Sequence, residues 1–366
     1  MIKLSDFINV NIETSDITST EQNKVVVYIC GGSVGSSKIY TSYSEELKRI
    51  LTDAGKKFCE QFFKCAGQSL RVMILNTSTI SDQQEVNKTF LSALDSLNLN
   101  EVAFAFETGT SPQYSMGSVG SSTGILDLIN KLYTLSSEGS SYRKLGVIQV
   151  DNINNAFNSK NLICKYTTQT EDVASVLAYL SRVSLNDSDS IKGYGFTKEL
   201  TCKDMSSELS TTTWTDIKNN LNTDIALTGS DICNFGGNTS AGTDIMQEYM
   251  SIYISQEILY AEWNLLKNKI QKSYGSEAVH NAIINVLEKY YDSGYLVPAV
   301  YEGNTIYEHV NGSNVEILKD GEMITAGYKI MTLPSTSSDS HSLPKVVIIL
   351  NTDKGINYIN NIGTIL

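Results

Sequence analysis

The chain has 366 residues, which is enough for two or three domains with a sizeable buried core. Its 28 lysines and arginines against 40 aspartates and glutamates give a net charge of −12, and this acidic balance argues against binding the phosphate backbone of nucleic acid as a main task. With 41% hydrophobic and 19% charged residues, the composition is that of an ordinary globular protein and excludes a disordered or fibrous one.

Membrane insertion and metal chemistry are not expected from the sequence. The longest apolar runs, 25–30 and 346–350, are too short to cross a bilayer, and the first thirty residues lack the basic start and apolar stretch of a signal peptide, so we expect folding in a cytosol. The six cysteines contain no C-x-x-C pair and are expected to be reduced, mostly packed thiols. His280, His309 and His341 have no metal-ligand spacing, so we expect neither a metal nor a cofactor.

The N-terminal segment has the pattern of a single detached strand. Between residues 6 and 13, Ile8, Val10 and Ile12 alternate with polar residues, which is the period of a strand with one apolar face. The polar stretch 14–23 then interrupts the pattern. We therefore interpret residues 1–23 as an arm and its tether, and an amphipathic strand on a tether must pair with something.

Strand and helix patterns alternate between residues 24 and 224, which predicts an α/β domain with a largely parallel sheet. Ser42 and Glu45 form a capping box, from which a helix is expected to continue to Gly67. The expected strands are 25–30, 70–75, 102–106 and 145–150, and further helix faces are expected at 125–132 and 173–180.

The pattern changes near residue 225, where we place a domain boundary. Two long helical patterns follow, at 245–270 and from 278 to Gly294. The chain then becomes glycine-punctuated and strand-like through 328–333 and 346–350. We expect a domain over 225–350, an α+β fold for the chain as a whole, and a second, C-terminal arm over 351–366.

One motif has the form of a catalytic serine. Residues 31–35, Gly-Gly-Ser-Val-Gly, fit G-x-S-x-G after an apolar strand, the sequence form of a nucleophile elbow with Ser33 as nucleophile. A nucleophile elbow needs a helix that starts at the serine, whereas the helix pattern here begins only at Ser42. The loop also lacks the ending of a phosphate-binding P-loop. A plain turn is favoured, and a serine hydrolase using Ser33 is kept as an alternative.

A series of weak motifs in a fixed order resembles the tail sheath proteins of contractile phage tails and related contractile injection systems. The resemblance covers the first hundred residues and most of 220–366. The motifs are FINVNI at 7–12, KFCEQFF at 57–63, LRVMIL at 70–75, DIALTG at 224–229, Gly236, Gly237, Gly242, Asp244, Trp263, GYLVPA at 294–299, GYKI at 327–330, PKVVIIL at 344–350 and the closing segment 355–366.

This resemblance implies a mechanical protein rather than an enzyme. Sheath subunits have an outer α/β domain and an inner domain close to the tail tube, and they stack as rings whose arms complete β-sheets of neighbouring subunits. Carried onto this sequence, the arms are 7–13 and 356–366. The subunit contacts would come from Phe7, Ile8, Val10, Ile12, Ile356, Tyr358, Ile359, Ile362 and Ile365.

The resemblance also implies the partners. The chain would form a helical homo-polymer around the tail tube protein, meet baseplate and tail terminator proteins at its ends, and contract to drive the tube through an envelope. It would belong to a virion tail that assembles in the host cytoplasm, with no nucleic acid or membrane partner. Besides the hydrolase, the open alternative is another tail component, such as a tube or baseplate subunit.

Overall fold

A computed structural model describes residues 25–66, 69–78, 85, 89, 92–93, 96–97, 101–107, 144–150, 159–183, 202–220, 223–228, 232–235, 237–268, 272–333, 346–352 and 355–359. These residues fall into two compact units, which divide between Tyr249 and Met250. We call them the α/β unit, described between residues 25 and 249, and the C-terminal unit, described from 250 to 359. The predicted strand at 6–13 and helix at 125–132 lie outside the described residues.

The α/β unit is built on an eight-stranded sheet with the order β2-β3-β1-β4-β5-β6-β7-β8. The six central strands are parallel, and the outer strands β2 and β8 are antiparallel to their neighbours. All four predicted strands are confirmed. The strands are β1 (Val25–Gly32), β2 (Ser36–Tyr40), β3 (Leu70–Asn76), β4 (Glu101–Phe106), β5 (Leu145–Val150), β6 (Leu162–Tyr166), β7 (Asp224–Thr228) and β8 (Ile232–Phe235).

The first predicted helix is in fact two helices, α1 (Glu45–Ile50) and α2 (Asp53–Ala66). The expected cap at Ser42 was wrong, because the hydroxyl of Ser44 accepts the hydrogen bond from the backbone N–H of Leu47. Thr52 then caps α2 by accepting a bond from the N–H of Gly55. Two N-capping residues eight positions apart therefore begin two successive helices in place of one.

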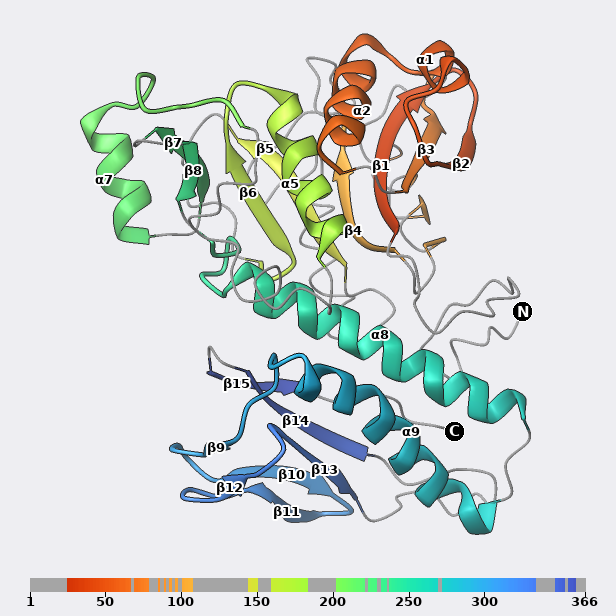
Figure 1. Cartoon of the computed structure of the whole chain (residues 1–366), viewed down its shortest axis with the longest axis vertical. Coiled ribbons are helices and arrows are strands. Elements are labelled where there is room, and N and C mark those ends of the chain that lie inside the picture. The colour runs from red at the N-terminus through yellow and green to blue at the C-terminus, as the bar shows by residue number, and fades with distance from the viewer. Residues whose placement is uncertain are drawn as a thin grey trace. The chain divides into compact units, whose positions relative to one another are not determined.

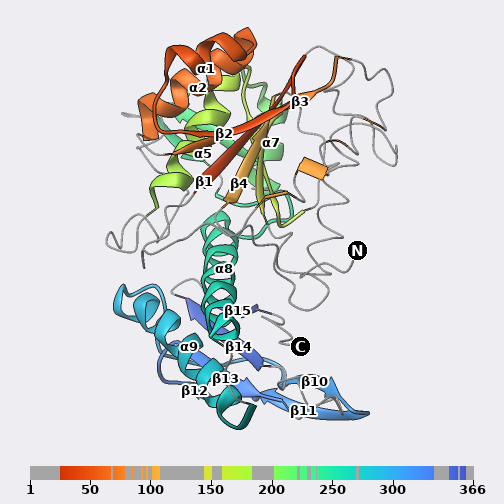
Figure 2. The same cartoon turned by 90° about the vertical axis from the view of Figure 1, so that its right-hand side faces the viewer.

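Helix α5 (Thr170–Arg182) confirms the predicted helix face at 173–180, and α7 (Thr211–Asn220) is a further helix of the α/β unit. Helices α2 and α5 lie side by side, and α5 contacts β1, β4 and β5 (Figure 1, Figure 2). Beneath α2, the rings of Tyr28 and Phe58 stack with their centroids 3.9 Å apart. Strands β1 and β4 are buried along almost their whole length, which explains their continuous apolar sequences.

The boundary between the units lies later than predicted. Strand β7 pairs with β6, and β8 pairs with β7, so residues 224–235 continue the first sheet instead of opening a second domain. The division falls inside α8 (Ile245–Lys267). The expected boundary near 225 is therefore corrected to 249/250.

The C-terminal unit combines the end of α8 and helix α9 (Lys272–Asp292) with small antiparallel sheets. The pattern that predicted a helix end at Gly294 is confirmed, as are the predicted strands at 328–333 and 346–350. The sheets are β9 (Ala299–Val300) with β12 (Met323–Ile324), β10 (Ile306–Val310) with β11 (Ser313–Leu318), and β13 (Tyr328–Thr332) with β14 (Val346–Thr352) and β15 (Gly355–Ile359).

The two units together are an α+β chain with a mostly parallel sheet in its first part, as the sequence predicts. Each helix within the described ranges is too short or too polar to cross a lipid bilayer.

Candidate functional site

The loop that carries Ser33 joins two strands. Strand β1 ends at Gly32 and β2 begins at Ser36, so the strand–turn–helix geometry of a nucleophile elbow does not form at Ser33. The glycine at 32 has a packing reason, because a Cβ there would lie 2.6 Å from a methyl carbon of Ile74. The G-x-S-x-G pattern is therefore accounted for by a tight turn against β3.

The carboxyl end of β1 is the place where a ligand would be expected in this sheet. The chain passes from β1 to β3 on one side and then to β4 on the other, and open α/β sheets bind ligands at such a reversal of strand order. Here the buried Glu107, which follows β4, accepts hydrogen bonds from the backbone N–H of Gly31 and from the hydroxyl of Thr52. Its own N–H donates to the carbonyl of Ile29 at 2.8 Å. The protein's own carboxylate thus uses the donors that an anionic ligand would need.

Four of the described cysteines are buried packing residues, whereas Cys65 is partly exposed. Burial raises the pKa of the Cys30 and Cys59 thiols, and the charge of Glu107 adds to this. Burial also raises the pKa of Cys164 and of Cys202 to about 12. All four are protonated at neutral pH and are poor nucleophiles, which agrees with the prediction of free, packed thiols.

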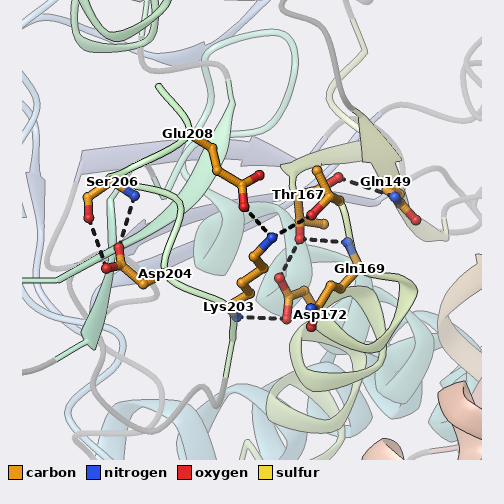
Figure 3. Close-up of polar contacts among 9 residues, drawn as sticks. Gln149, Thr167, Gln169, Asp172, Lys203, Asp204, Ser206 and Glu208 are labelled. Carbon is orange, nitrogen blue, oxygen red and sulfur yellow. Dashed lines mark hydrogen bonds and ion pairs between the residues drawn. The ribbon is translucent and has the colours of Figure 1, made fainter. Parts of the chain in front are cut away.

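A polar network lies where β5 and β6 end and α5 begins (Figure 3). The hydroxyl of Thr167 donates to the carboxylate of Asp172 and accepts from the N–H of Gln169. Gln149 donates its side-chain amide to the carbonyl of Thr167 at 3.2 Å. The N–H of Lys203 donates to the other oxygen of Asp172 at 2.9 Å. Burial raises the pKa of Asp172 against the lowering effect of these bonds.

The same network holds the segment 202–208 in place. The ammonium of Lys203 donates to the hydroxyl of Thr168 at 2.9 Å and pairs with Glu208. Asp204 accepts from both the N–H and the hydroxyl of Ser206. These donors and acceptors bond to one another, so the network braces the loop against α5.

A buried ion pair links β6 to β7. The ammonium of Lys165 lies 2.8 Å from the carboxylate of Asp224, both side chains are fully buried, and the two residues are register partners. Burial lowers the pKa of Lys165, but the charge and hydrogen bond of Asp224 outweigh it and the net direction is upward. Lys165 therefore stays charged, and the pair fixes β7 in the sheet.

In the C-terminal unit, part of the predicted C-terminal arm lies on an outer strand. Ile356, Tyr358 and Ile359 belong to β15, which pairs antiparallel with β14 of the same chain from Ile348↔Ile359 to Thr352↔Gly355. Strand β14 is buried throughout and has β13 on its other side. The arm was expected to begin at residue 351, but β14 continues to Thr352.

The other predicted contact residues are Phe7, Ile8, Val10, Ile12, Ile362 and Ile365, and they lie outside the described residues. Contact with a neighbouring subunit stays a prediction for both arms. What the structure adds is the position of the C-terminal one, at the edge of a three-stranded sheet.

Two glycine motifs of the sheath resemblance meet beside β14. Gly294, with φ 76°, ends α9, and the N–H groups of the next two residues donate to the carbonyl of Tyr290. Gly327, with φ 70°, packs closely against the residues that follow α9, so that a Cβ on it would lie 2.5 Å from the backbone nitrogen of Val297. Asn351 joins both, donating its N–H to Gly327 at 2.7 Å and its side-chain amide to Val297 at 2.6 Å.

These features define a protein whose described polar clusters serve its own fold. Over the described ranges, no three histidine, cysteine, aspartate or glutamate side chains gather into a group that could hold a metal ion.

No protein-family model matches the chain, and no curated protein matches it either. Among solved structures, it is similar to a chain in the cryo-EM structure of the anti-feeding prophage baseplate, with a TM-score of 0.62 at 10% identity over 95% of this chain and 96% of that one. The fold is therefore one that occurs in a prophage baseplate assembly. A chain of the PVC sheath complex, from an extracellular contractile injection system in its contracted state, aligns over 90% of this chain and 97% of its own at 10% identity, with a TM-score of 0.48.

Proposed function

We propose that the protein is a structural component of a contractile injection machine and that it forms the sheath. In this role it polymerises as stacked rings around a tail tube and contracts to drive the tube through a target envelope. The fold shared with a baseplate chain supports the class of machine. The observation that carries the sheath role is β15, a C-terminal strand at the outer edge of a sheet with a fully buried central strand.

A strand at a sheet edge suits a lattice that must move without breaking. Among the described strands, β13 and β15 are the outer ones of this sheet, and strand addition uses the backbone N–H and carbonyl groups of an outer strand for affinity. Each main-chain hydrogen bond contributes about 0.5–1.5 kcal/mol net, so an added strand of five residues is held by several kcal/mol. Subunits joined in this way can rotate and slide while the strand stays paired.

The proposal requires no cofactor and no catalytic residue. Its partners are further copies of the chain, the tail tube protein, and the baseplate and terminator proteins that close the ends of the sheath. The site of action is the tail of a virion or of a similar particle, after assembly in the host cytoplasm.

A baseplate subunit is the second candidate, because the matched solved chain comes from a baseplate structure and is covered over 96% of its length. The two candidates differ in what the purified protein does alone. A sheath subunit adds rings without a fixed limit, whereas a baseplate subunit closes into a single ring.

The test is electron microscopy of the purified full-length protein, alone and with its tube protein. We expect hollow tubes or ring stacks of variable length, wide enough to surround the tube. Single closed rings favour the baseplate role, and a protein that stays monomeric under all conditions contradicts both.

A matched pair of variants tests the bonding surface. Replacing both Ile359 and Ile362 by Asp removes apolar anchors from the C-terminal arm, and we expect it to stop polymerisation. Ile39→Asp makes the same chemical change at a half-exposed position of β2, an outer strand of the other sheet, and should leave the polymer intact. Polymers that form equally well from all variants contradict the arm assignment.

A further inference from the structure

Helix α8 carries a buried ionisable side chain that no described residue pairs with. Ser251, Ser255, Ile258 and Glu262 follow one another at helical spacing on the buried side of α8, and Glu262 is only 1% exposed. The hydroxyl of Ser255 donates to the carbonyl of Ser251, one turn earlier, and so cannot also donate to the carboxyl. Among the described residues, neither side-chain oxygen of Glu262 has a hydrogen-bond partner.

The charged groups nearest along α8 do not neutralise Glu262. Glu257, five residues earlier, accepts a hydrogen bond from the hydroxyl of Tyr290 on α9. Lys267, five residues later, is exposed. Burial raises the pKa of the Glu262 carboxyl to about 8. Among the described residues, on α8 or on any neighbouring element, no charged group offsets this effect.

We propose that Glu262 is a proton-operated control point of the C-terminal unit: the unit is closed while this carboxyl carries its proton and loosens when the proton is released to solvent. A buried carboxylate without a partner is far costlier than a buried neutral acid. Release of the proton therefore favours any state in which α8 lets water reach this position. This inference goes beyond the proposed function and does not depend on it, because it concerns the single chain.

The direction of the effect follows from the two states. In the unfolded chain the carboxyl titrates near its ordinary value of 4.5, whereas in the folded unit its pKa is about 8. Between these values the folded state holds a proton that the unfolded state has lost, so the contribution of Glu262 to stability falls as pH rises from 4.5 to 8 and is constant above. The unfolding equilibrium constant should rise by about three orders of magnitude across this window through Glu262 alone.

The experiment is urea unfolding of the full chain as a function of pH. The chain has two tryptophans, so Trp214→Phe leaves Trp263, the neighbour of Glu262, as a local fluorescent reporter. The parent, Glu262→Gln and Glu262→Met are compared in this background. Glu277→Gln serves as the matched control, because Glu277 is an exposed carboxyl on α9 of the same unit.

We expect the parent and the Glu277→Gln control to lose stability between pH 5 and 8, and both Glu262 variants to lose much less. A slope unchanged in Glu262→Gln and Glu262→Met overturns the proposal. Infrared spectroscopy gives a direct reading that does not depend on unfolding. A protonated-carboxyl band present at pH 6.5 in the parent and missing in Glu262→Gln is expected, and identical spectra overturn the proposal.

Discussion

The contact between Gly327 and the segment after α9 leads to a sharp prediction for Gly327→Ala. This glycine has φ 70°, and a Cβ there would lie 2.5 Å from the nitrogen of Val297 and 2.7 Å from the carbonyl carbon of Leu296. Those atoms are backbone, so they cannot yield as the end of a side chain would. The positive φ alone costs a non-glycine residue about 1–2 kcal/mol. Overpacking adds about 1–3 kcal/mol, so the two costs together span about 2–5 kcal/mol, and we expect a loss near the middle of this range, roughly 3–4 kcal/mol.

Two other glycines of the same unit separate these contributions. Gly312 and Gly321 have φ of 78° and 76°, and a Cβ on either meets nothing within 4 Å. Gly312→Ala and Gly321→Ala should therefore show the conformational cost without the clash, about 1–2 kcal/mol each. The difference in unfolding free energy between these controls and Gly327→Ala therefore measures the cost of the clash with Val297 and Leu296.

The assay is urea unfolding followed through Trp263 in the Trp214→Phe background. With a slope of about 2–3 kcal/mol per molar urea, Gly327→Ala should lower the midpoint by 1 M or more and the controls by roughly half a molar. Because the carbonyl of Gly327 accepts the N–H of Asn351 in β14, the same variant should also lose polymerisation. Equal midpoint shifts in all three variants would refute the reasoning, since they would show that the approach to Val297 has no energetic weight.

Three further predictions concern the ion pair, the N-terminal arm and the serine motif. Lys165→Met should cost about 3–5 kcal/mol by leaving Asp224 buried without this counter-ion, and adding Asp224→Leu should recover most of the loss; equal instability of the single and double variants in urea would count against the pair. Deleting residues 1–13 should stop polymerisation in the microscope while the melting temperature stays nearly constant, and a large drop in that temperature would contradict a detached arm. Ser33→Ala should leave assembly unchanged, and loss of a measured esterase activity in this variant would revive the hydrolase alternative.

The strands of the α/β sheet were predictable where burial on both faces makes their sequences continuously apolar. The predicted strands at 25–30, 102–106 and 145–150 lie inside or at β1, β4 and β5 for this reason. The outer strand β2 was missed, because Ser36, Ser37 and Lys38 are exposed and carry no apolar alternation. An outer strand forms because it pairs with the strand beside it, here β3, and the sequence of β2 alone does not show that pairing.

The polar clusters were not predictable because their members are far apart in the chain. Glu107 and Gly31 are separated by 76 residues, and Lys165 and Asp224 by 59. A weak signal was present in β6 and β7. Lys165 lies inside an apolar strand and Asp224 opens another, and a buried charge of either sign needs a partner of the opposite sign. Glu262 gave no such signal: in α8 it looks like a solvated helix residue, and only the packing of the unit shows that it is buried.

The pairing of β15 with β14 bears directly on how a lattice would form. Only residues 353–354 separate β14 from β15, so the β15 of the same chain is always the strand nearest to this edge of β14. This local pairing has a high effective concentration, which a neighbouring subunit must exceed if it is to exchange strands. Addition of a neighbour's strand to the outer edge of β15 or of β13 requires no such exchange, because β14 then keeps both of its partners. The two routes differ in a covalent test: a disulfide between cysteines placed at the register partners Ile349 and Tyr358 joins residues of one chain if β15 stays in place, and joins two chains if the strands are exchanged.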